Sequence, residues 1–418
     1  MKKIIKKILP KNILNSYHYL KARLASFYYN HPSEKMIVIG IVGSKGKTTT
    51  ANLLWYCLDG AGYLTGLTGT ANLKFGQKEE LNKYHMTMPG PFILQQHLKK
   101  MADSGCQFAI VETPSEGQTQ FRHIGINYDL LIYTNLTDEK VEAHNFSLKI
   151  LNKHNARVFR IINKLKRKTI AGKKIEKTII VNADDRRANE YLRHPADRKI
   201  SFGLKNEADF VGLVEDKPDG LELTINQNEK YFINLPGTIN GINSLAAIVA
   251  AKTIGLTENE IKKSLNKNIK IPGRMEEIKN NKNLNIIVDY AHEQVGLKAL
   301  LDWAKKNKKN GRVIVLIGAE GGGRDKEKRP LMGKIAGQLA EIVIVANVDP
   351  YDDNPEEIIN DIILGIKETN CSKENYYSIP DRRLAIRKAL QLAKSDDCLL
   401  YTSPSPRDRT RSRMPSSA

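Results

Sequence analysis

The sequence predicts an α/β protein in which a doubly wound parallel sheet is followed by a smaller, Rossmann-like α/β domain. From residue 36 onward, short β-type runs alternate with helical ones, which is the pattern of parallel sheets covered by helices. A helical stretch over 243–253 precedes Pro272-Gly273, where we expect a second βα series to begin. Shorter alternating runs over 205–235 predict a β-hairpin insert. The expected strands of the two parallel sheets are 36–42, 107–112, 129–135, 178–182, 285–290, 312–318 and 341–347.

A glycine-rich turn follows the first expected strand. Residues 40–50 read Gly-Ile-Val-Gly-Ser-Lys-Gly-Lys-Thr-Thr-Thr and lead into a helical pattern, the arrangement of a phosphate-binding loop. Gly43 and Gly46 let backbone N–H groups converge on phosphate oxygens, while Lys47 supplies a positive charge and Thr48 a hydroxyl for Mg²⁺. Ile41 breaks the strict Gly-x4-Gly-Lys-Ser/Thr pattern, so a plain glycine-rich turn is the alternative. We predict a P-loop ATPase domain and a nucleotide-binding enzyme.

Composition excludes several classes of protein. The 418 residues carry a net charge of +20, but the basic residues are diffuse and lack the interleaved aromatic platform of a nucleic-acid-binding surface. We therefore expect no nucleic-acid partner. No apolar run approaches the roughly 20 residues of a membrane span. The four cysteines are scattered without a Cys-x-x-Cys pair, which favours a reducing cytoplasm over a disulfide framework or zinc ribbon.

The two ends of the chain differ from the rest. Residues 1–35 hold eight Lys/Arg and one Glu and predict a basic amphipathic helix, whose apolar stripe lies either on a membrane surface or against the body of the protein. Residues 401–418 are rich in Ser, Pro and Arg, and the stretch from residue 402 contains no Lys, Asn or Ile. We interpret this segment as a non-native tail; an authentic disordered tail is the alternative. The stripe consists of Ile13, Tyr17, Leu20, Leu24 and Phe27, at helical spacing.

A series of motifs runs along the chain. The motifs are Gly43-Ser-Lys-Gly-Lys-Thr-Thr, Thr87-Met-Pro, Glu112, Thr134-Asn-Leu-Thr, Pro236-Gly with Asn240 and Asn243-Ser-Leu-Ala-Ala, Pro272-Gly-Arg-Met-Glu, Asp289-Tyr-Ala-His, and Arg324-Asp with Lys328-Arg-Pro-Leu-Met-Gly. In this order and spacing they resemble the Mur ligases, ATP-dependent enzymes that form amide bonds in peptidoglycan synthesis. The resemblance covers about residues 36–400 and is strongest to the branch that adds the third amino acid to UDP-N-acetylmuramoyl-dipeptide. It divides the chain into a central ATP-binding domain over 36–271 and a truncated C-terminal Rossmann-like domain over 272–400.

The resemblance assigns cofactors and roles. It implies ATP and Mg²⁺, with the metal on Thr48 and Glu112, and an acyl-phosphate formed on a substrate carboxylate before an amine attacks. It places Asn243 on the adenine side, Arg274 at the phosphates, Asp289 at the ribose and His292 near the nucleotide. The expected phosphate-binding residues are Gly43, Ser44, Lys45, Gly46, Lys47, Thr48 and Thr49; the expected substrate-binding residues are Thr87, Arg324, Lys328 and Arg329; the expected catalytic residues are Lys47, Glu112, Lys140 and His292.

Each assignment has a plainer alternative. Glu112 could be a surface carboxylate, although it ends an apolar strand where ligands bind in such sheets. Asn243 could be a residue at a helix start, and Thr87 a turn residue before a proline. The basic and histidine side chains could be solvated loop residues, and these are Arg274, His292, Lys328 and Arg329.

The chain also departs from the family pattern. Glu139-Lys140 stands where family members carry Asp-His, and Asn155 stands where many carry a carbamylated lysine that supports a second metal ion. We hypothesise that the Lys140 ammonium replaces the charge of that metal; a slip in register or loss of catalysis would explain the same residues. The arginine of the family's Asp-Asn-Pro-Arg motif is missing from 348–351, and a UDP-sugar-binding domain is not recognised before residue 36.

These observations predict an ATP-dependent acid–amino-acid ligase that extends a UDP-N-acetylmuramoyl-peptide. We expect a cytoplasmic monomer, with residues 1–35 as a possible peripheral contact to the inner face of the membrane. A ligase similar to folylpolyglutamate synthase is one alternative, since that relative also lacks the UDP-sugar domain. A non-catalytic, membrane-associated nucleotide-binding scaffold is another, motivated by the apolar stripe and the missing second-metal residues.

Overall fold

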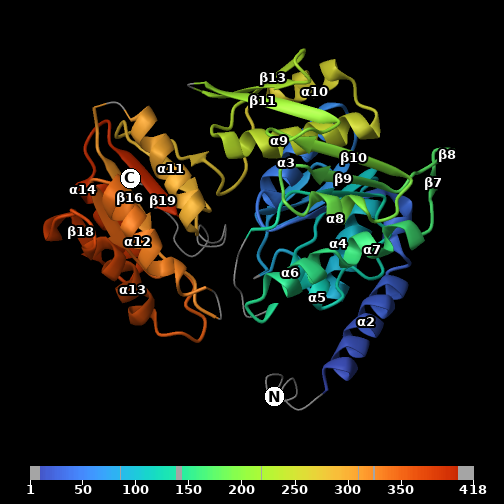
Figure 1. Cartoon of the computed structure of the whole chain (residues 1–418), viewed down its shortest axis with the longest axis horizontal. Helices are drawn as coiled ribbons and strands as arrows, with labels where there is room; N and C mark the ends of the chain where they lie inside the picture. Colours follow the sequence, from blue (N-terminus) through green and yellow to red (C-terminus); the bar gives the residue numbers. More distant parts are fainter. Residues whose placement is uncertain are drawn as a thin grey trace. The chain divides into compact units, whose positions relative to one another are not determined.

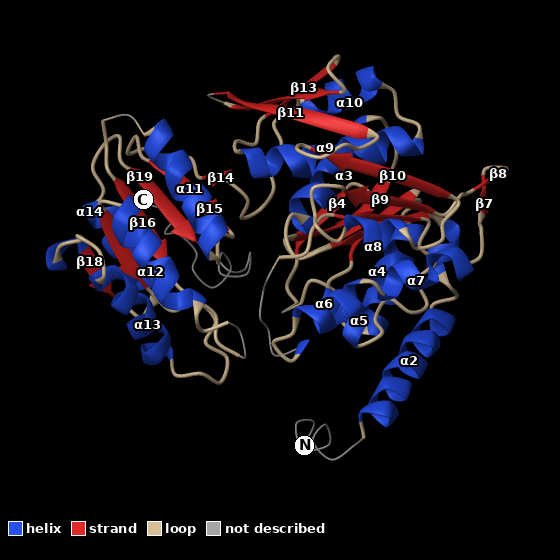
Figure 2. Cartoon of the chain, in the orientation of Figure 1, coloured by secondary structure: helices blue, strands red, loops and turns tan. Residues whose placement is uncertain are grey.

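The computed structural model describes residues 10–84, 86–137, 144–217, 219–308, 310–322 and 325–402. The chain divides into two compact units: of the described residues, those up to 137 and those over 147–269 belong to the first, and 144–146 together with those from 270 onward belong to the second. Both are α/β units in which helices pack on a mainly parallel sheet (Figures 1 and 2). The α/β fold class predicted from the alternating pattern is therefore confirmed. No helix in these described ranges is both long and apolar enough to cross a membrane.

The first unit is built on one large sheet. Its strands are β1 (Ile37–Val42), β2 (Thr65–Thr68), β3 (Asn72–Phe75), β4 (Lys78–Leu81), β5 (Phe108–Glu112), β6 (Leu130–Tyr133), β9 (Thr178–Asn182), β10 (Arg198–Gly203), β11 (Phe210–Lys217), β12 (Gly220–Ile225) and β13 (Glu229–Ile233). They pair in the order β13-β12-β11-β10-β9-β6-β1-β5-β2-β3-β4. Pairing is parallel from β11 to β2 and antiparallel at both ends. Strands β7 (Thr169–Ile170) and β8 (Lys173–Lys174) form a separate ribbon.

Helices cover this sheet on its two faces. They are α2 (Lys11–Tyr28), α3 (Lys47–Gly60), α4 (Pro91–Asp103), α5 (Ser115–Thr119), α6 (Leu148–Asn155), α7 (Arg157–Ile161), α8 (Ala188–Leu192), α9 (Thr238–Ile254) and α10 (Glu258–Leu265), with 3-10 turns η1 (Pro32–Lys35) and η3 (Ile162–Lys164). Helix α9 is apolar around most of its circumference and is buried against α3, as expected of a helix without a polar face. Helix α10 starts at a capping box in which Thr257 and Glu260 each bind the other's backbone N–H.

Strand β1 lies in the middle of the large sheet and is buried on both faces, because its sequence Ile-Val-Ile-Gly-Ile-Val is apolar throughout. The chain builds β5 and β2 on one side of β1 and then crosses to build β6 and β9 on the other. Such a reversal of strand order opens a crevice at the carboxyl ends of the strands, where ligands bind in open α/β sheets. The glycine-rich loop that follows β1 therefore begins at the expected position for a ligand site.

The insert expected over 205–235 is longer than the predicted hairpin. It is a three-stranded antiparallel meander of β11, β12 and β13, and β11 pairs in parallel with β10 so that the meander extends the main sheet. The prediction of a single hairpin missed the third strand because residues 229–233 follow a second tight turn at Asn226-Gln227, whose residues adopt positive φ.

The second unit has its own sheet. Its strands are β14 (Glu276–Glu277), β15 (Asn285–Asp289), β16 (Val313–Ile317), β17 (Ile342–Val345), β18 (Tyr376–Ser378) and β19 (Cys398–Thr402), and its helices are α11 (Gln294–Asn307), α12 (Lys328–Leu339), α13 (Pro355–Lys367) and α14 (Arg382–Leu392), with the 3-10 turn η4 (Lys373–Asn375). The order is β14-β15-β19-β16-β17-β18, parallel except for β14. Separate apolar clusters fill the two faces of this sheet.

Strand β19 extends two residues past residue 400, the expected end of the C-terminal domain. Tyr401 and Thr402 are buried and belong to this strand, which lies between β15 and β16. Arg382 fixes the end of the strand, because its Nε donates to the Tyr401 hydroxyl over 2.6 Å while its guanidinium lies over the same ring. Residues 403–418 lie outside the described ranges.

Candidate functional site

The glycine-rich loop connects β1 to α3 and depends on its two glycines. Gly43 and Gly46 have φ of +143° and +80°, values that disfavour any residue with a Cβ atom. A Cβ on Gly43 would lie 2.1 Å from Oγ1 of Thr134, and one on Gly46 would lie 2.1 Å from Oδ1 of Asn243. Both glycines are therefore required by backbone conformation and by close neighbours, and Asn243 of α9 lies against the loop itself.

Residues after β6 hold the loop in place. The backbone carbonyl of Asn135 accepts a hydrogen bond from the N–H of Ser44, and its side-chain Oδ1 accepts one from the N–H of Lys45, both over 2.9 Å. Thr134 Oγ1 donates to the carbonyl of Lys45 over 2.7 Å. The ammonium of Lys47 stays at the loop, where it donates to the carbonyls of Gly43 and Ser44. The Thr134-Asn135 pair thus orders the segment that carries the N–H groups and the lysine.

Glu112 ends strand β5 beside the loop, because β5 pairs with β1 in a register that places Glu112 next to Ile41. Its side chain is buried, with 1% of its surface exposed. Oε2 accepts a hydrogen bond from Thr48 Oγ1 over 3.0 Å, and Oε1 accepts one from the backbone N–H of Thr70 over 2.8 Å. The two residues expected to bind the metal ion are therefore in direct contact.

The oxygen atoms of Thr48 and Glu112 suit Mg²⁺. Thr48 Oγ1 and Glu112 Oε2 lie 3.0 Å apart, and hydroxyl and carboxylate oxygens are the kind of ligand that Mg²⁺ takes from proteins. The described residues contain no cluster of three or more His, Cys, Asp or Glu side chains able to hold a metal ion.

Thr70 is a residue of the site to which sequence reasoning gave no role. Its Oγ1 donates to Glu112 Oε2 over 3.0 Å and lies 2.8 Å from Oγ1 of Thr87. Because Thr70 has one hydroxyl hydrogen and gives it to the carboxylate, Thr87 is the donor in the second contact. Thr87, expected to bind substrate, is thereby connected to Glu112. Thr49 lies in the first turn of α3 and is buried.

Asn155, which the resemblance predicts to replace a carbamylated lysine, is buried at the end of α6. Neither its Oδ1 nor its Nδ2 has a hydrogen-bond partner in the structure. Buried amides without partners are uncommon and destabilising. The neighbouring His154 is engaged, with Nδ1 3.0 Å from Thr119 Oγ1. Lys140, the other departure from the family pattern, lies outside the described residues.

The second unit collects Arg274, Asp289 and His292 around Tyr290. Asp289 Oδ2 accepts a hydrogen bond from the N–H of Met275 over 2.8 Å, which ties the turn before β14 to the end of β15. The guanidinium of Arg274 lies 4.5 Å from the centre of the Tyr290 ring, and His292 Nδ1 is 2.8 Å from the carbonyl of Tyr290. Burial raises the pKa of Asp289, and the positive charge of Arg274 and nearby backbone N–H groups oppose that rise.

Arg329 lies in the interior of the second unit. It is 1% exposed in the first turn of α12, and its Nη atoms contact Asp361 over 3.0 Å and Asp353 over 3.1 Å. This guanidinium links α12 to α13 and the loop before it, instead of reaching into solvent. Lys328 is also buried, so the two do not form the solvated charge run considered from the sequence. Arg324 lies outside the described residues.

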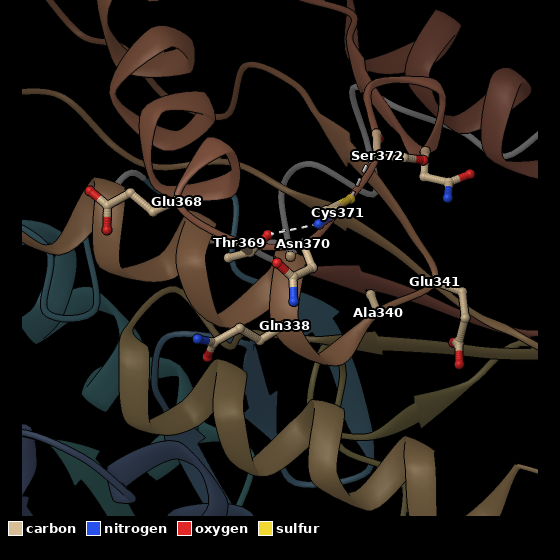
Figure 3. Close-up of a pocket in the computed structure, with 10 residues that line it drawn as sticks. Gln338, Ala340, Glu341, Glu368, Thr369, Asn370, Cys371 and Ser372 are labelled. Carbon is tan, nitrogen blue, oxygen red and sulfur yellow. Dashed lines mark hydrogen bonds between the residues drawn. The ribbon is translucent and has the colours of Figure 1, made fainter.

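The second unit also contains a hollow of about 480 Å³ at the carboxyl ends of α12 and α13 (Figure 3). None of the predicted site residues lines it. Its carboxylates are already paired, Glu341 with Lys308 and Glu368 with Lys334. Burial raises the pKa of the Cys371 thiol that lines it, which disfavours the reactive thiolate. The hollow therefore lacks groups that would make it a catalytic site.

Comparison with known proteins relates both units to one family. The model of the Mur ligase middle domain matches residues 41–251, and that of the Mur ligase glutamate ligase domain matches residues 273–404. A UDP-N-acetylmuramoyl-L-alanyl-D-glutamate–2,6-diaminopimelate ligase of Clostridium acetobutylicum is 33% identical over 391 residues, which cover 91% of this chain and 75% of that protein.

Two solved structures have a similar fold. A UDP-N-acetylmuramoyl-L-alanyl-D-glutamate–2,6-diaminopimelate ligase is 26% identical, with a TM-score of 0.58 over 88% of this chain and 72% of that one. A folylpolyglutamate synthase of Mycobacterium tuberculosis, complexed with ADP and AMPPCP, is 14% identical, with a TM-score of 0.71 over 94% of this chain and 95% of that one. The second likeness concerns the fold alone.

Proposed function

Because the chain belongs to the Mur ligase family, we propose that it is an ATP-dependent ligase that adds an amino acid to a UDP-N-acetylmuramoyl-peptide in peptidoglycan synthesis. The observation that carries the proposal is the contact between Thr48 and Glu112 next to the glycine-rich loop. The loop would bind the phosphates and the Thr48–Glu112 pair would bind Mg²⁺ beside them, as phosphoryl transfer from ATP requires.

The reaction has two steps. A carboxylate oxygen of the acceptor attacks the γ-phosphorus of ATP, so that ADP leaves and an acyl-phosphate forms. The amino group of the incoming amino acid then attacks the acyl carbon, inorganic phosphate leaves, and the nitrogen loses a proton. Both steps develop negative charge on oxygen, so they are accelerated mainly by positioned positive groups and N–H donors.

Residues of the first unit would perform this work. The backbone N–H groups of 43–48 and the Lys47 ammonium would bind the phosphates, assisted by the N-terminus of α3. Thr48 and Glu112 would hold Mg²⁺, which neutralises phosphate charge when bound. Thr70 would keep Glu112 oriented and link it to Thr87, for which we propose a contact to the acceptor. We further propose that Asn243 orders the loop from α9 and faces the nucleotide.

For the residues of the second unit we propose the roles that the family resemblance implies. We propose that Arg274 binds phosphate oxygens, Asp289 the ribose hydroxyls, and that His292 lies close to the nucleotide during the reaction. Arg329 is proposed to support the fold of this unit and not to contact substrate, since its charge is balanced by two aspartates. The proposed roles of Lys328 and Arg324 in substrate binding, and of Lys140 beside the acyl-phosphate, rest on the sequence. We also propose a cytoplasmic monomer with a membrane contact through residues 1–35.

The test is release of phosphate from ATP and Mg²⁺ by the purified protein, with UDP-N-acetylmuramoyl-dipeptide as acceptor. Diaminopimelate, lysine and the other amino acids would be supplied one at a time, because this chain has Tyr351 where diaminopimelate-adding members carry an arginine. We expect release that requires both the acceptor and one amino acid. Release with a folate acceptor and glutamate would instead assign the folylpolyglutamate synthase alternative, and ATP binding without any turnover would assign a non-catalytic scaffold.

A further inference from the structure

Helix α2 has its small side chains against the first unit and its large apolar side chains exposed, which is the reverse of the usual arrangement. The side chains that face the unit are small: Ala22 and Ala25 are fully buried, and Ser26 is 2% exposed. Ser26 Oγ donates to the carbonyl of Gly125 over 2.9 Å, and Gly125 approaches so closely that a Cβ there would lie 2.7 Å from Ser26 Cβ. The helix is therefore firmly docked by its small residues, next to α4.

The large apolar side chains of α2 point away from the unit. The apolar stripe defined above is exposed over its whole length: Ile13 by 53%, Tyr17 by 54%, Leu20 by 65%, Leu24 by 57% and Phe27 by 72%. Helical residues are about 100° apart, so these five share one side of the helix, opposite Ala22. From Ile13 to Phe27 the stripe extends about 21 Å, at about 1.5 Å per helical residue. Contiguous exposed apolar surface of this kind marks an interaction site.

The charges around the stripe indicate what covers it. On the same helical projection, Lys21 and Arg23 border the stripe on its two sides. The sequence before the helix adds Lys2, Lys3, Lys6 and Lys7, and residues 1–35 contain a single acidic residue. Apolar side chains flanked by cations, with tyrosine at the edge, suit the boundary between the acyl chains and the headgroups of an anionic bilayer.

We propose that α2 docks the protein on an anionic lipid surface, with the apolar stripe in the headgroup region and the flanking Lys and Arg residues at the lipid phosphates. A bilayer accepts the convex side of a helix without a complementary groove, whereas a protein partner would need one. The docked side of α2 keeps its contacts to the first unit, so lipid binding needs no unfolding of the helix. The inference is independent of the proposed ligase activity.

The experiment is co-sedimentation of the full chain with vesicles of phosphatidylcholine alone or mixed with phosphatidylglycerol. We expect binding to the anionic vesicles that weakens as salt is raised. The Leu20→Ser/Leu24→Ser variant should bind these vesicles at least tenfold more weakly. Its matched control is Val295→Ser/Leu364→Ser, which removes two apolar side chains of similar exposure from the second unit and should bind within twofold of wild type. Removal of the charges of Lys21 and Arg23 should weaken binding about fivefold for each charge.

Three results would overturn the proposal. The first is no binding of the wild-type chain to anionic vesicles at low salt. The second is equal binding by the Leu20→Ser/Leu24→Ser variant and its control. The third is a dimer in solution that the same double substitution converts to a monomer, which would assign the stripe to a second copy of this chain. Unchanged thermal unfolding of the variants would show that both retain their fold. Every variant also keeps Lys2, Lys3, Lys6 and Lys7, so the contribution of these lysines to binding is the same in each comparison.

Discussion

Two hydrogen bonds join Thr70 to Glu112: the backbone N–H donates to Oε1 over 2.8 Å and the hydroxyl donates to Oε2 over 3.0 Å. The loop that carries Thr70 thus fixes the orientation of the Glu112 carboxylate, and this needs no bound ligand. Since Oε2 also contacts Thr48, Thr70 fixes the orientation in which Glu112 and Thr48 can share a magnesium ion.

Substitution of Thr70 tests this positioning role. The Thr70→Val variant keeps the backbone bond and the side-chain shape but loses the hydroxyl. A hydrogen bond to a charged group contributes about 1.5–3 kcal/mol, so we expect kcat/KM to fall about tenfold or more and the Mg²⁺ concentration for half-maximal rate to rise. Thr70→Ser should restore both values. A wild-type Mg²⁺ dependence in the valine variant would show that the hydroxyl plays no part.

Asn135 should control nucleotide affinity through the loop. The Asn135→Ala variant removes the acceptor of the Lys45 N–H and leaves the backbone bond to Ser44 in place. We expect the Kd for ATP to rise about five- to tenfold, since one hydrogen bond contributes about 1 kcal/mol. Isothermal titration with ATP and Mg²⁺ measures the change, and Asn206→Ala, an exposed asparagine of the same unit, is the control. Equal affinities of the two variants would contradict a role in ordering the loop.

Arg329 should matter for stability more than for substrate binding. In Arg329→Ala the carboxylates of Asp353 and Asp361 lose a buried partner. These aspartates are partly exposed, so we expect a loss of about 2–3 kcal/mol in the free energy of unfolding, somewhat below the cost of breaking a fully buried pair. Lys334→Ala, which removes the exposed pair with Glu368, should change it by less than about 1 kcal/mol. Unchanged stability of Arg329→Ala with a raised KM would restore the direct substrate contact predicted from the sequence.

His97 should contribute to acid sensitivity. Burial, with a smaller effect of Lys100, lowers the pKa of His97 to about 4, whereas an unfolded chain takes up this proton near pH 6.5. Between these values the unfolded state binds more protons, so the free energy of unfolding falls as pH is lowered from 6.5 to 4, by up to about 3 kcal/mol. Denaturant unfolding of His97→Gln across this range should show a smaller decrease. A pH dependence identical to wild type would mean that His97 has the same pKa in the folded and unfolded states.

Substitution of Lys140 tests the hypothesis that its ammonium takes the place of a second metal ion. If its ammonium replaces the charge of a second metal ion, Lys140→Ala should lower kcat at least a hundredfold with little change in the Kd for ATP, because the charge is needed for the transition state and not for nucleotide binding. Lys140→Arg should retain part of the rate. Full activity of the alanine variant in the phosphate-release assay would refute the hypothesis.

The predictable features of this protein are those that depend on neighbouring residues in the chain. Strand β1 and its loop followed from an apolar run and two glycines. Glu112 was named by the resemblance to the Mur ligases, and its place at the end of an apolar strand supported that assignment. Thr70 was missed because the stretch after β2 looks like an ordinary turn, and its partners lie 17 and 42 residues away. The ion pairs of Arg329 could not be predicted for the same reason: its aspartates are 24 and 32 residues distant, and only folding brings them to the guanidinium.

The most direct test of the central claim is the mass of the product. The wild-type chain, the Glu112→Ala variant and a Glu215→Gln control at an exposed carboxylate would be incubated with ATP, Mg²⁺, UDP-N-acetylmuramoyl-dipeptide and the amino acid selected in the phosphate-release screen. We predict that the acceptor gains the mass of that amino acid less one water, with wild type and with Glu215→Gln but not with Glu112→Ala. An acceptor of unchanged mass with wild-type protein that binds ATP would contradict the ligase assignment.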